Sequence, residues 1–126
     1  FKSVNDTHGH QVGDQILVAT AKLLEKNRRS ADLVARYGGE EFILVFPGSD
    51  KELVAMICER IVTAIASETH DFVEDGLSVT ISIGYATHGD EVSFGSIDEF
   101  VHAADTALYS AKMEGRNRSV EFREAS

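Results

Sequence analysis

Arg36-Tyr37-Gly38-Gly39-Glu40-Glu41-Phe42 is the stretch that decides the fold of this chain. Apolar runs at residues 33–35 and 42–46 flank it, and this pattern predicts a β-hairpin with the glycines in its turn. Glycine permits positive φ and lets a bulky anion approach main-chain N–H groups without meeting a Cβ. Glu40 and Glu41 add hard oxygen ligands at the tip, which suit a magnesium ion that carries phosphates. The plainer alternative is a hairpin with two solvated acids.

Composition predicts one compact domain over residues 1–126. The chain has 43% hydrophobic residues, enough to bury a core, and a formal net charge of −9. This acidity argues against a surface that binds nucleic acid, because such a surface needs clustered Lys and Arg. The negative charge of a nucleoside triphosphate, however, can be offset by a metal ion and a few cations. The single Cys58 lies in a helical apolar pattern, so we expect it to pack as a small buried hydrophobe, which suits a reducing compartment.

Apolar periodicity predicts three helices and two further strands. The expected ranges are about 14–28, 50–67 and 97–113 for the helices, and 77–85 and 119–122 for the strands. Asp14 is the expected N-cap of the first helix, and two capping boxes, Ser49 with Glu52 and Ser96 with Glu99, begin the others. The order of elements favours an α+β fold in which helices cover a mostly antiparallel sheet.

Several other kinds of protein are disfavoured by the sequence. It has no Gly-x-x-x-x-Gly-Lys-Ser/Thr loop and no nucleophile elbow, and His8 with His10 does not complete a zinc site. No apolar run approaches the roughly 18 to 20 residues that span a bilayer, so we expect no membrane segment and a cytoplasmic location. The chain begins with Phe inside a motif, and we expect it to be a piece of a longer protein.

The heptapeptide resembles the signature of the GGDEF family, the diguanylate cyclases, in its variant with Glu in third place. Further matches in the family's order extend the resemblance over nearly the whole chain. They are Phe1-Lys2, Asn5-Asp6, Gly9-His10, Gly13-Asp14, Arg29-x-x-Asp32, Thr80-Ile81-Ser82-Ile83-Gly84 and Lys112-x-x-Gly115-Arg116-Asn117. The resemblance implies a nucleotidyl-cyclase-like fold with a ferredoxin-like core, whose first helix and central first strand would precede Phe1.

The resemblance also implies a reaction. Two GTP molecules would condense into cyclic di-GMP with release of two pyrophosphates, so two domains would face each other in a homodimer. Mg²⁺, or Mn²⁺ in its place, would be the cofactor. A further aspartate ligand is expected upstream of Phe1, so we expect the 126 residues alone to be inactive. The parent protein is expected to carry an N-terminal sensory or receiver domain, and upstream segments could anchor it to a membrane.

The resemblance assigns residues to the active site. Glu40 is the implied metal ligand and catalytic residue, with Glu41 beside it. The implied substrate-binding residues are Lys2, Asn5, Asp14, Gly38, Gly39, Lys112 and Arg116. Carboxylate and amide groups can read the edge of guanine, and cations four residues apart on a helix can share one anion. The alternatives are a turn residue at Asn5, an N-cap at Asp14 and helix-dipole partners at Lys112 and Arg116.

Arg29 and Asp32 have the spacing of an inhibitory product site in the family, to which Arg60 would contribute. Arginine can donate two hydrogen bonds to the O6 and N7 edge of guanine. The alternative is a surface ion pair of about 0 to 1 kcal/mol. Two rival functions remain, a catalytically silent domain that binds GTP or cyclic di-GMP as a regulatory ligand and a purely structural dimerisation domain.

Overall fold

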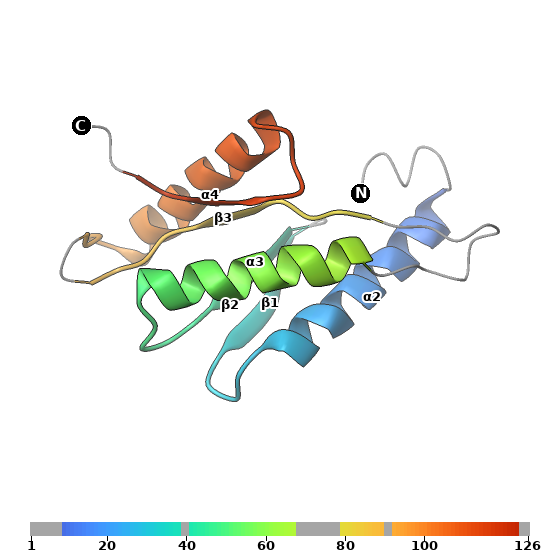
Figure 1. Ribbon diagram of the computed structural model, residues 1–126, viewed down its shortest axis with the longest axis horizontal. Coiled ribbons are helices and arrows are strands. Elements are labelled where there is room, and N and C mark those ends of the chain that lie inside the picture. The colour runs from blue at the N-terminus through green and yellow to red at the C-terminus, as the bar shows by residue number, and fades with distance from the viewer. Residues whose placement is uncertain (1–8, 39–40, 68–78, 90–91, 124–126) are drawn as a thin grey trace. The chain divides into compact units, whose positions relative to one another are not determined.

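The computed structural model describes residues 9–38, 41–67, 79–89 and 92–123 (Figure 1). These residues belong to two compact units, one reaching to Pro47 and the other containing Gly48–Ser67 and the chain from Val79 onward. In the described residues, no helix combines the length and the apolar character that crossing a membrane requires.

The first unit contains a long helix followed in the chain by the predicted hairpin. Helix α2 spans His10–Asn27, and strands β1, Leu33–Gly38, and β2, Glu41–Val45, pair antiparallel (Figure 1). Leu33 lies opposite Val45, and the register shifts between Arg36 and Gly38, so that Tyr37 is an extra residue on β1. Such a bulge bends and twists a strand locally. The hairpin prediction is therefore confirmed, and the turn residues 39–40 lie outside the described part of the chain.

The start of α2 corrects the prediction that Asp14 is its N-cap. The helix begins at His10 and its N-cap is Gly9, whose φ of 89° is one that glycine adopts without strain. Gly13 donates from its backbone N to the Gly9 carbonyl at 3.1 Å, so one helical turn already precedes Asp14. Asp14 is therefore an exposed residue inside the helix. The side-chain preference of Asp for N-caps was outweighed by the backbone freedom of Gly9.

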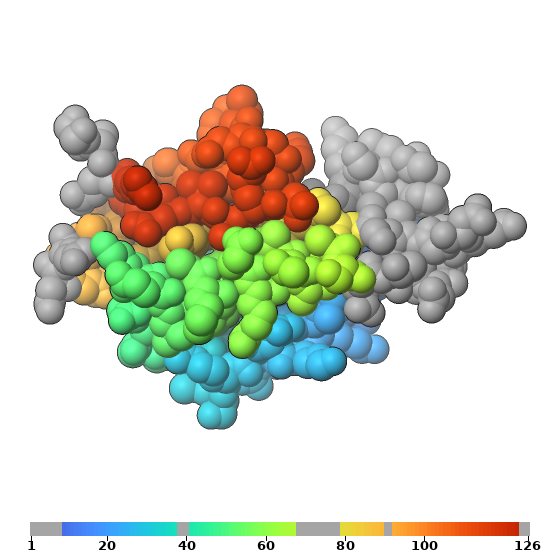
Figure 2. Space-filling view, viewed as in Figure 1, coloured from blue at the N-terminus to red at the C-terminus, as the bar shows by residue number. Residues whose placement is uncertain are grey.

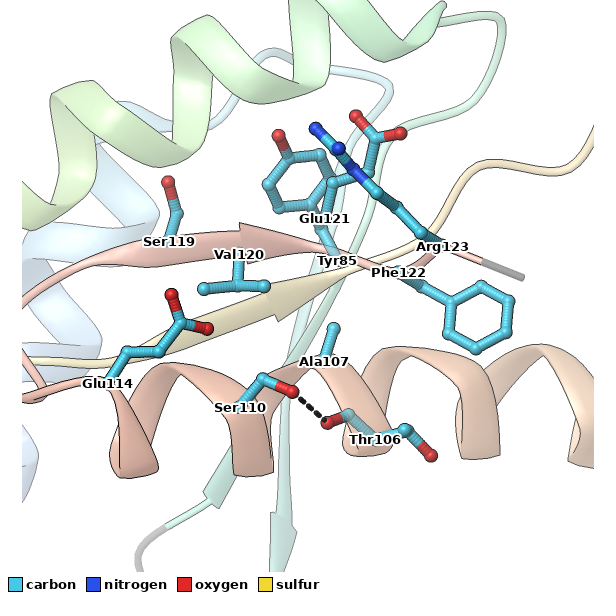
Figure 3. Close-up of a pocket in the computed structure, with 10 residues that line it drawn as sticks. All are labelled: Tyr85, Thr106, Ala107, Ser110, Glu114, Ser119, Val120, Glu121, Phe122 and Arg123. Carbon is cyan, nitrogen blue, oxygen red and sulfur yellow. Dashed lines mark hydrogen bonds between the residues drawn. The ribbon is translucent and has the colours of Figure 1, made fainter. Parts of the chain in front are cut away.

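The second unit places two strands with two helices. Helix α3 spans Lys51–Ser67, β3 spans Ile83–Tyr85, α4 spans Ile97–Met113 and β4 spans Ser119–Glu121. Strands β3 and β4 pair in parallel, with Ile83 opposite Ser119, and both strands contact both helices. Figure 3 shows the strand pair between α3 and α4. Helices together with an antiparallel hairpin and a short strand pair are the elements that the predicted α+β fold requires.

The strand predicted over residues 77–85 is shorter in the structure. Only Ile83–Tyr85 is a strand, residues 79–82 are described without one, and residues 77–78 lie outside the described part. A strand needs a hydrogen-bonded neighbour, and β4 offers three residues of pairing. Within the described residues, the apolar alternation over 79–82 therefore has no partner strand to pair with.

The predicted helix caps have different outcomes. Asp50 caps α3, because the Asp50 Oδ1 accepts from the Leu53 backbone N at 2.9 Å, and the capping box of Ser49 with Glu52 stays a prediction. At α4 the prediction is confirmed, since the Ser96 hydroxyl accepts from the Glu99 backbone N at 3.2 Å. Either contact satisfies an N–H that the helix leaves without an intrahelical partner.

Helix α3 buries one face at helical spacing. Its buried residues are Val54, Ile57, Cys58, Ile61, Val62 and Ile65. The outer side of α3 lies on the face shown in Figure 2. The burial of Cys58, which is 3% exposed, raises the pKa of its thiol to about 12. The prediction that this cysteine packs as a small hydrophobe is confirmed.

Candidate functional site

The turn between α2 and β1 holds Arg29 against Asp32. The Arg29 guanidinium donates from Nη2 to Oδ1 at 2.8 Å and from Nε to Oδ2 at 3.0 Å. The backbone closes the same turn, because the Arg29 N donates to Asp32 Oδ2 at 2.9 Å and the Asp32 N donates to the Arg29 carbonyl at 3.0 Å. A two-point bond between planar groups fixes the orientation of the guanidinium as well as its position.

The two side chains of this pair differ in exposure. The Asp32 side chain is 1% exposed, whereas that of Arg29 is 42% exposed. The hydrogen bond from Arg29 holds the pKa of the Asp32 carboxyl below its usual value, against the opposing effect of burial, and the same bond raises the pKa of Arg29. The arrangement is therefore a guanidinium at the surface, orientated by a buried carboxylate.

The heptapeptide is only partly within the described residues. Gly38 ends β1 opposite Glu41, which begins β2 with an exposed side chain. Gly39 and Glu40 lie outside the described part, as do Lys2 and Asn5. Among the residues that the structure describes, no three His, Cys, Asp or Glu side chains are grouped as metal ligands. The role of Glu40 as a metal ligand therefore stays a prediction.

Asp14 lines a pocket of about 390 Å³ in the first unit. The pocket walls come from α2 and from both strands of the hairpin, including Val34, Arg36 and Phe42. Sequence reasoning named Asp14 but assigned no separate role to Arg36 and Phe42, which belong to the heptapeptide itself. The structure thus brings one predicted guanine-reading residue together with the signature hairpin, and that guanine-reading role stays a prediction.

Lys112 and Arg116 are not both on the helix end as predicted. Helix α4 ends at Met113, and Gly115 and Arg116 follow with φ of 123° and 61°. The Arg116 backbone N donates to the Ala111 carbonyl at 2.9 Å, which closes the end of the helix. The chain between Lys112 and Arg116 therefore leaves the helix and takes a left-handed conformation, so the two residues are not one helical turn apart. Both side chains are exposed, and their role as phosphate ligands stays a prediction.

A larger pocket, of about 520 Å³, lies in the second unit and contains none of the predicted site residues (Figure 3). It is formed along β4 and α4, with Val120 and Phe122 turned toward the helix and Ser119 and Glu121 turned away from it. The pKa of Tyr85, which lines this pocket, is raised chiefly by burial and to a lesser extent by the nearby charge of Glu121. Its mixed lining of hydroxyl, acidic and apolar groups does not single out a ligand.

Comparison with known proteins decides the family. The family described as "Diguanylate cyclase, GGDEF domain" matches residues 1–118 of the chain. The chain belongs to the GGDEF family. Diguanylate cyclase DgcM of Escherichia coli is 42% identical over 119 residues, which cover 94% of this chain and 27% of that protein. The chain spans less than a third of each of the first curated relatives that it matches.

Solved GGDEF domains have the same fold. The active GGEEF domain of a diguanylate cyclase from Vibrio cholerae superposes with a TM-score of 0.85 at 33% identity, covering 98% of this chain and 77% of that one. The GGDEF domain of DgcB from Caulobacter crescentus, solved in complex with c-di-GMP, gives a TM-score of 0.86 at 32% identity and covers 98% of this chain and 72% of that one.

Two further arginines, Arg60 and Arg28, bear on the predicted product site. Arg60 is exposed on α3, in the second unit, and its contribution to a product site stays a prediction. The sequence assigned no separate role to Arg28. Its guanidinium bonds to the turn that carries Arg29 and Asp32, a contact that charge patterning alone did not reveal.

Proposed function

We propose that the protein containing this domain is a magnesium-dependent diguanylate cyclase, inhibited by its own product at Arg29 and Asp32. The observation that carries the proposal is the orientated Arg29 guanidinium, held by a buried carboxylate directly before the signature hairpin. Family membership supports it, as do relatives named diguanylate cyclases and a similar GGDEF domain solved with c-di-GMP.

In the proposed reaction the 3′-hydroxyl of each GTP attacks the α-phosphate of the other. Each attack forms one P–O bond, breaks the bond between the α- and β-phosphates, and releases pyrophosphate and a proton. Two successive attacks close the cyclic dinucleotide. Each domain would hold one GTP, so the active form would be a homodimer. For such transfers a protein mainly positions the nucleophile and offsets charge.

The chain's own residues would share this work. Asp14 would accept hydrogen bonds from guanine, and the glycines beside Gly38 would let phosphate oxygens reach backbone N–H groups. Lys112 and Arg116 would bind phosphates. The chemistry of Glu40 and Glu41 fits a magnesium ion, since both offer carboxylate oxygens and Glu41 is exposed at the hairpin. A bound magnesium ion would neutralise the charge that develops on the phosphate oxygens.

The active site is tested by Glu40→Ala in the full-length protein. We expect cyclic di-GMP formation from GTP to be abolished while the thermal transition hardly moves, because an acid at a hairpin tip serves ligand binding more than packing. Glu59→Ala on α3, which removes an exposed acid from a helix, is the matched control and should retain activity. Product formation by Glu40→Ala at the wild-type rate would exclude Glu40 as a metal ligand.

The product site is tested by Arg29→Ala. We expect cyclic di-GMP affinity to fall by about 1 to 3 kcal/mol, the usual scale for an arginine bonded to guanine at two points, and product inhibition to be relieved. Initial rates without product should stay unchanged. A full-length wild type that binds cyclic di-GMP through Arg29 but forms none from GTP would favour the catalytically silent, regulatory alternative.

A further inference from the structure

Arg28 ties the product-site turn to the end of α2. It is the C-cap residue of that helix, with extended backbone angles of φ −84° and ψ 154°. Its Nη1 donates to the carbonyl oxygen of Asp32 at 3.1 Å and to that of Arg29 at 3.3 Å. Its Nε donates to the carboxylate of Glu25, one turn back in the helix. One guanidinium therefore joins the last turn of α2 to both ends of the Arg29–Asp32 turn.

These contacts tie the turn to the end of α2, whereas the bonds between Arg29 and Asp32, from side chain and backbone alike, lie within the turn. Bonds within the turn leave the turn able to tilt as a body relative to α2, because both residues lie in a connection between two elements. A donor shared by the two carbonyls restrains that tilt. The ion pair with Glu25 in turn restrains Arg28, whose side chain is 34% exposed.

The charges of the cluster also fit a positioning role. Arg28 and Arg29 are adjacent cations, and Glu25 and Asp32 supply one carboxylate to each. The charge of Arg28 contributes, after the larger effect of Arg29, to the lowered pKa of Asp32. Arg28 thus favours the ionised form of the carboxylate that orientates Arg29. Repulsion between the neighbouring guanidinium groups is offset within the cluster itself.

We propose that Arg28 is a positioning residue for product binding, which holds the turn so that Arg29 presents its guanidinium in one orientation. The inference rests on the proposed inhibitory site, and it adds a residue outside the Arg-x-x-Asp pattern. A group that is ordered before binding loses less conformational freedom when the ligand arrives. Affinity for a guanine dinucleotide should therefore depend on Arg28, although Arg28 need not touch the ligand.

The first measurement is cyclic di-GMP affinity by titration calorimetry, with product inhibition of initial rates, in the full-length protein. Arg28→Ala should weaken binding about tenfold, the scale of ordering one long side chain, and raise the inhibitory concentration in parallel. Arg28→Lys keeps the charge but lacks the planar fork, so it should restore only part of the affinity. Lys26→Ala, an exposed cation in the same helical turn, should bind as wild type. Product-free turnover should be unchanged in all three.

The second measurement needs no ligand. Proton exchange of the Arg29 Nε–H, followed by NMR, reports whether Arg29 stays bonded to Asp32. We expect this exchange to speed up in Arg28→Ala and to recover partly in Arg28→Lys. Unchanged exchange in Arg28→Ala would overturn the positioning role, even if Arg29→Ala abolishes product binding. Faster exchange with wild-type affinity would overturn it as well.

The two measurements also separate this inference from the proposed function. If Arg29→Ala binds cyclic di-GMP as tightly as wild type, the proposed inhibitory site is wrong, and the role of Arg28 in product binding fails with it. If Arg29→Ala loses affinity and Arg28→Ala does not, the inhibitory site stands and the positioning inference alone is overturned. Loss of affinity in both variants, with faster Arg29 exchange in Arg28→Ala, supports the inference.

Discussion

Gly84 of β3 lies directly against the backbone of α4 at Leu108. A Cβ at position 84 would be 2.0 Å from the Leu108 backbone N and 2.3 Å from the Ala104 carbonyl oxygen. Real Cβ contacts essentially never fall below 3.0 Å, and backbone atoms of a helix cannot swing aside as a flexible side chain can. The glycine is therefore what allows β3 and α4 to touch without an intervening side chain.

Gly84→Ala should be strongly destabilising. The added methyl would force the strand and helix apart, and overpacking of this kind costs about 3 kcal/mol or more. Urea unfolding followed by circular dichroism measures the change. Gly89→Ala is the matched control, because a Cβ there would meet nothing within 4 Å. Equal stability of the two variants would mean that β3 and α4 separate easily, contrary to the observed packing.

Ser96→Ala should remove the N-cap of α4. The Ser96 hydroxyl accepts from the Glu99 backbone N, and loss of such a cap costs about 1 kcal/mol. Thermal unfolding of the variant should show the loss, whereas Ser96→Asp should retain most of the stability because its carboxylate can accept the same bond. Ser93→Ala, in the preceding exposed segment, is the control. An unfolding temperature equal to that of wild type in Ser96→Ala would show that Glu99 and the other first-turn acids suffice to stabilise the start of α4.

Cys58 should resist thiol reagents in the folded protein. Burial, together with the neighbouring charge of Glu59, raises its pKa to about 12, and the thiolate is the reactive form. Labelling at pH 8 should be at least about a hundredfold slower than in urea. Since the chain has a single cysteine, the signal belongs to one site. Labelling at the rate of the unfolded chain would contradict the burial.

The raised pKa of Cys58 also makes the stability of the folded protein depend on pH. Because the folded-state pKa of the thiol is raised above its ordinary value of 9.0, the folded state favours the neutral thiol. The corresponding stabilisation is complete below about pH 9 and is lost as the pH rises toward 12. Cys58→Ala should remove this dependence.

Patterns within one element were predictable from the sequence. The hairpin around Gly38 follows from two apolar runs that meet at a glycine pair, and the cap at Ser96 follows from a local hydrogen bond with Glu99. Each depends on residues a few positions apart. The helix start at Gly9 was missed although it is also local, because side-chain preference at Asp14 was weighed above the backbone freedom of glycine.

Features that depend on contacts between elements were not predictable. The length of β3 is set by its pairing with β4. At the proposed product site, the sequence indicated Arg29 and Asp32, but the bonds from Arg28 to their carbonyls depend on how α2 ends. Such contacts follow from backbone geometry that periodicity does not encode.

The ion pair between Arg29 and Asp32 should make stability depend on pH at the acid end. The Asp32 pKa is lowered from 3.8, chiefly by the hydrogen bond from Arg29, so the folded state favours the carboxylate. The stabilisation is therefore fully present above about pH 4 and is lost as the pH falls through the lower folded-state pKa. Asp32→Asn should cost about 1 to 3 kcal/mol near neutral pH, the scale of hydrogen bonds to a charged group that is buried.

The measurement is urea unfolding of wild type and Asp32→Asn between pH 2.5 and 8. We expect the difference in unfolding free energy to be constant above about pH 5 and to shrink below about pH 4, where the wild-type carboxylate takes up a proton. Asp105→Asn, an exposed acid on α4, should differ little from wild type throughout. A difference that stayed constant down to pH 2.5 would mean that the turn is held by the backbone bonds and not by the ionised Asp32, because only the charged carboxylate accepts at both of its oxygens from Arg29.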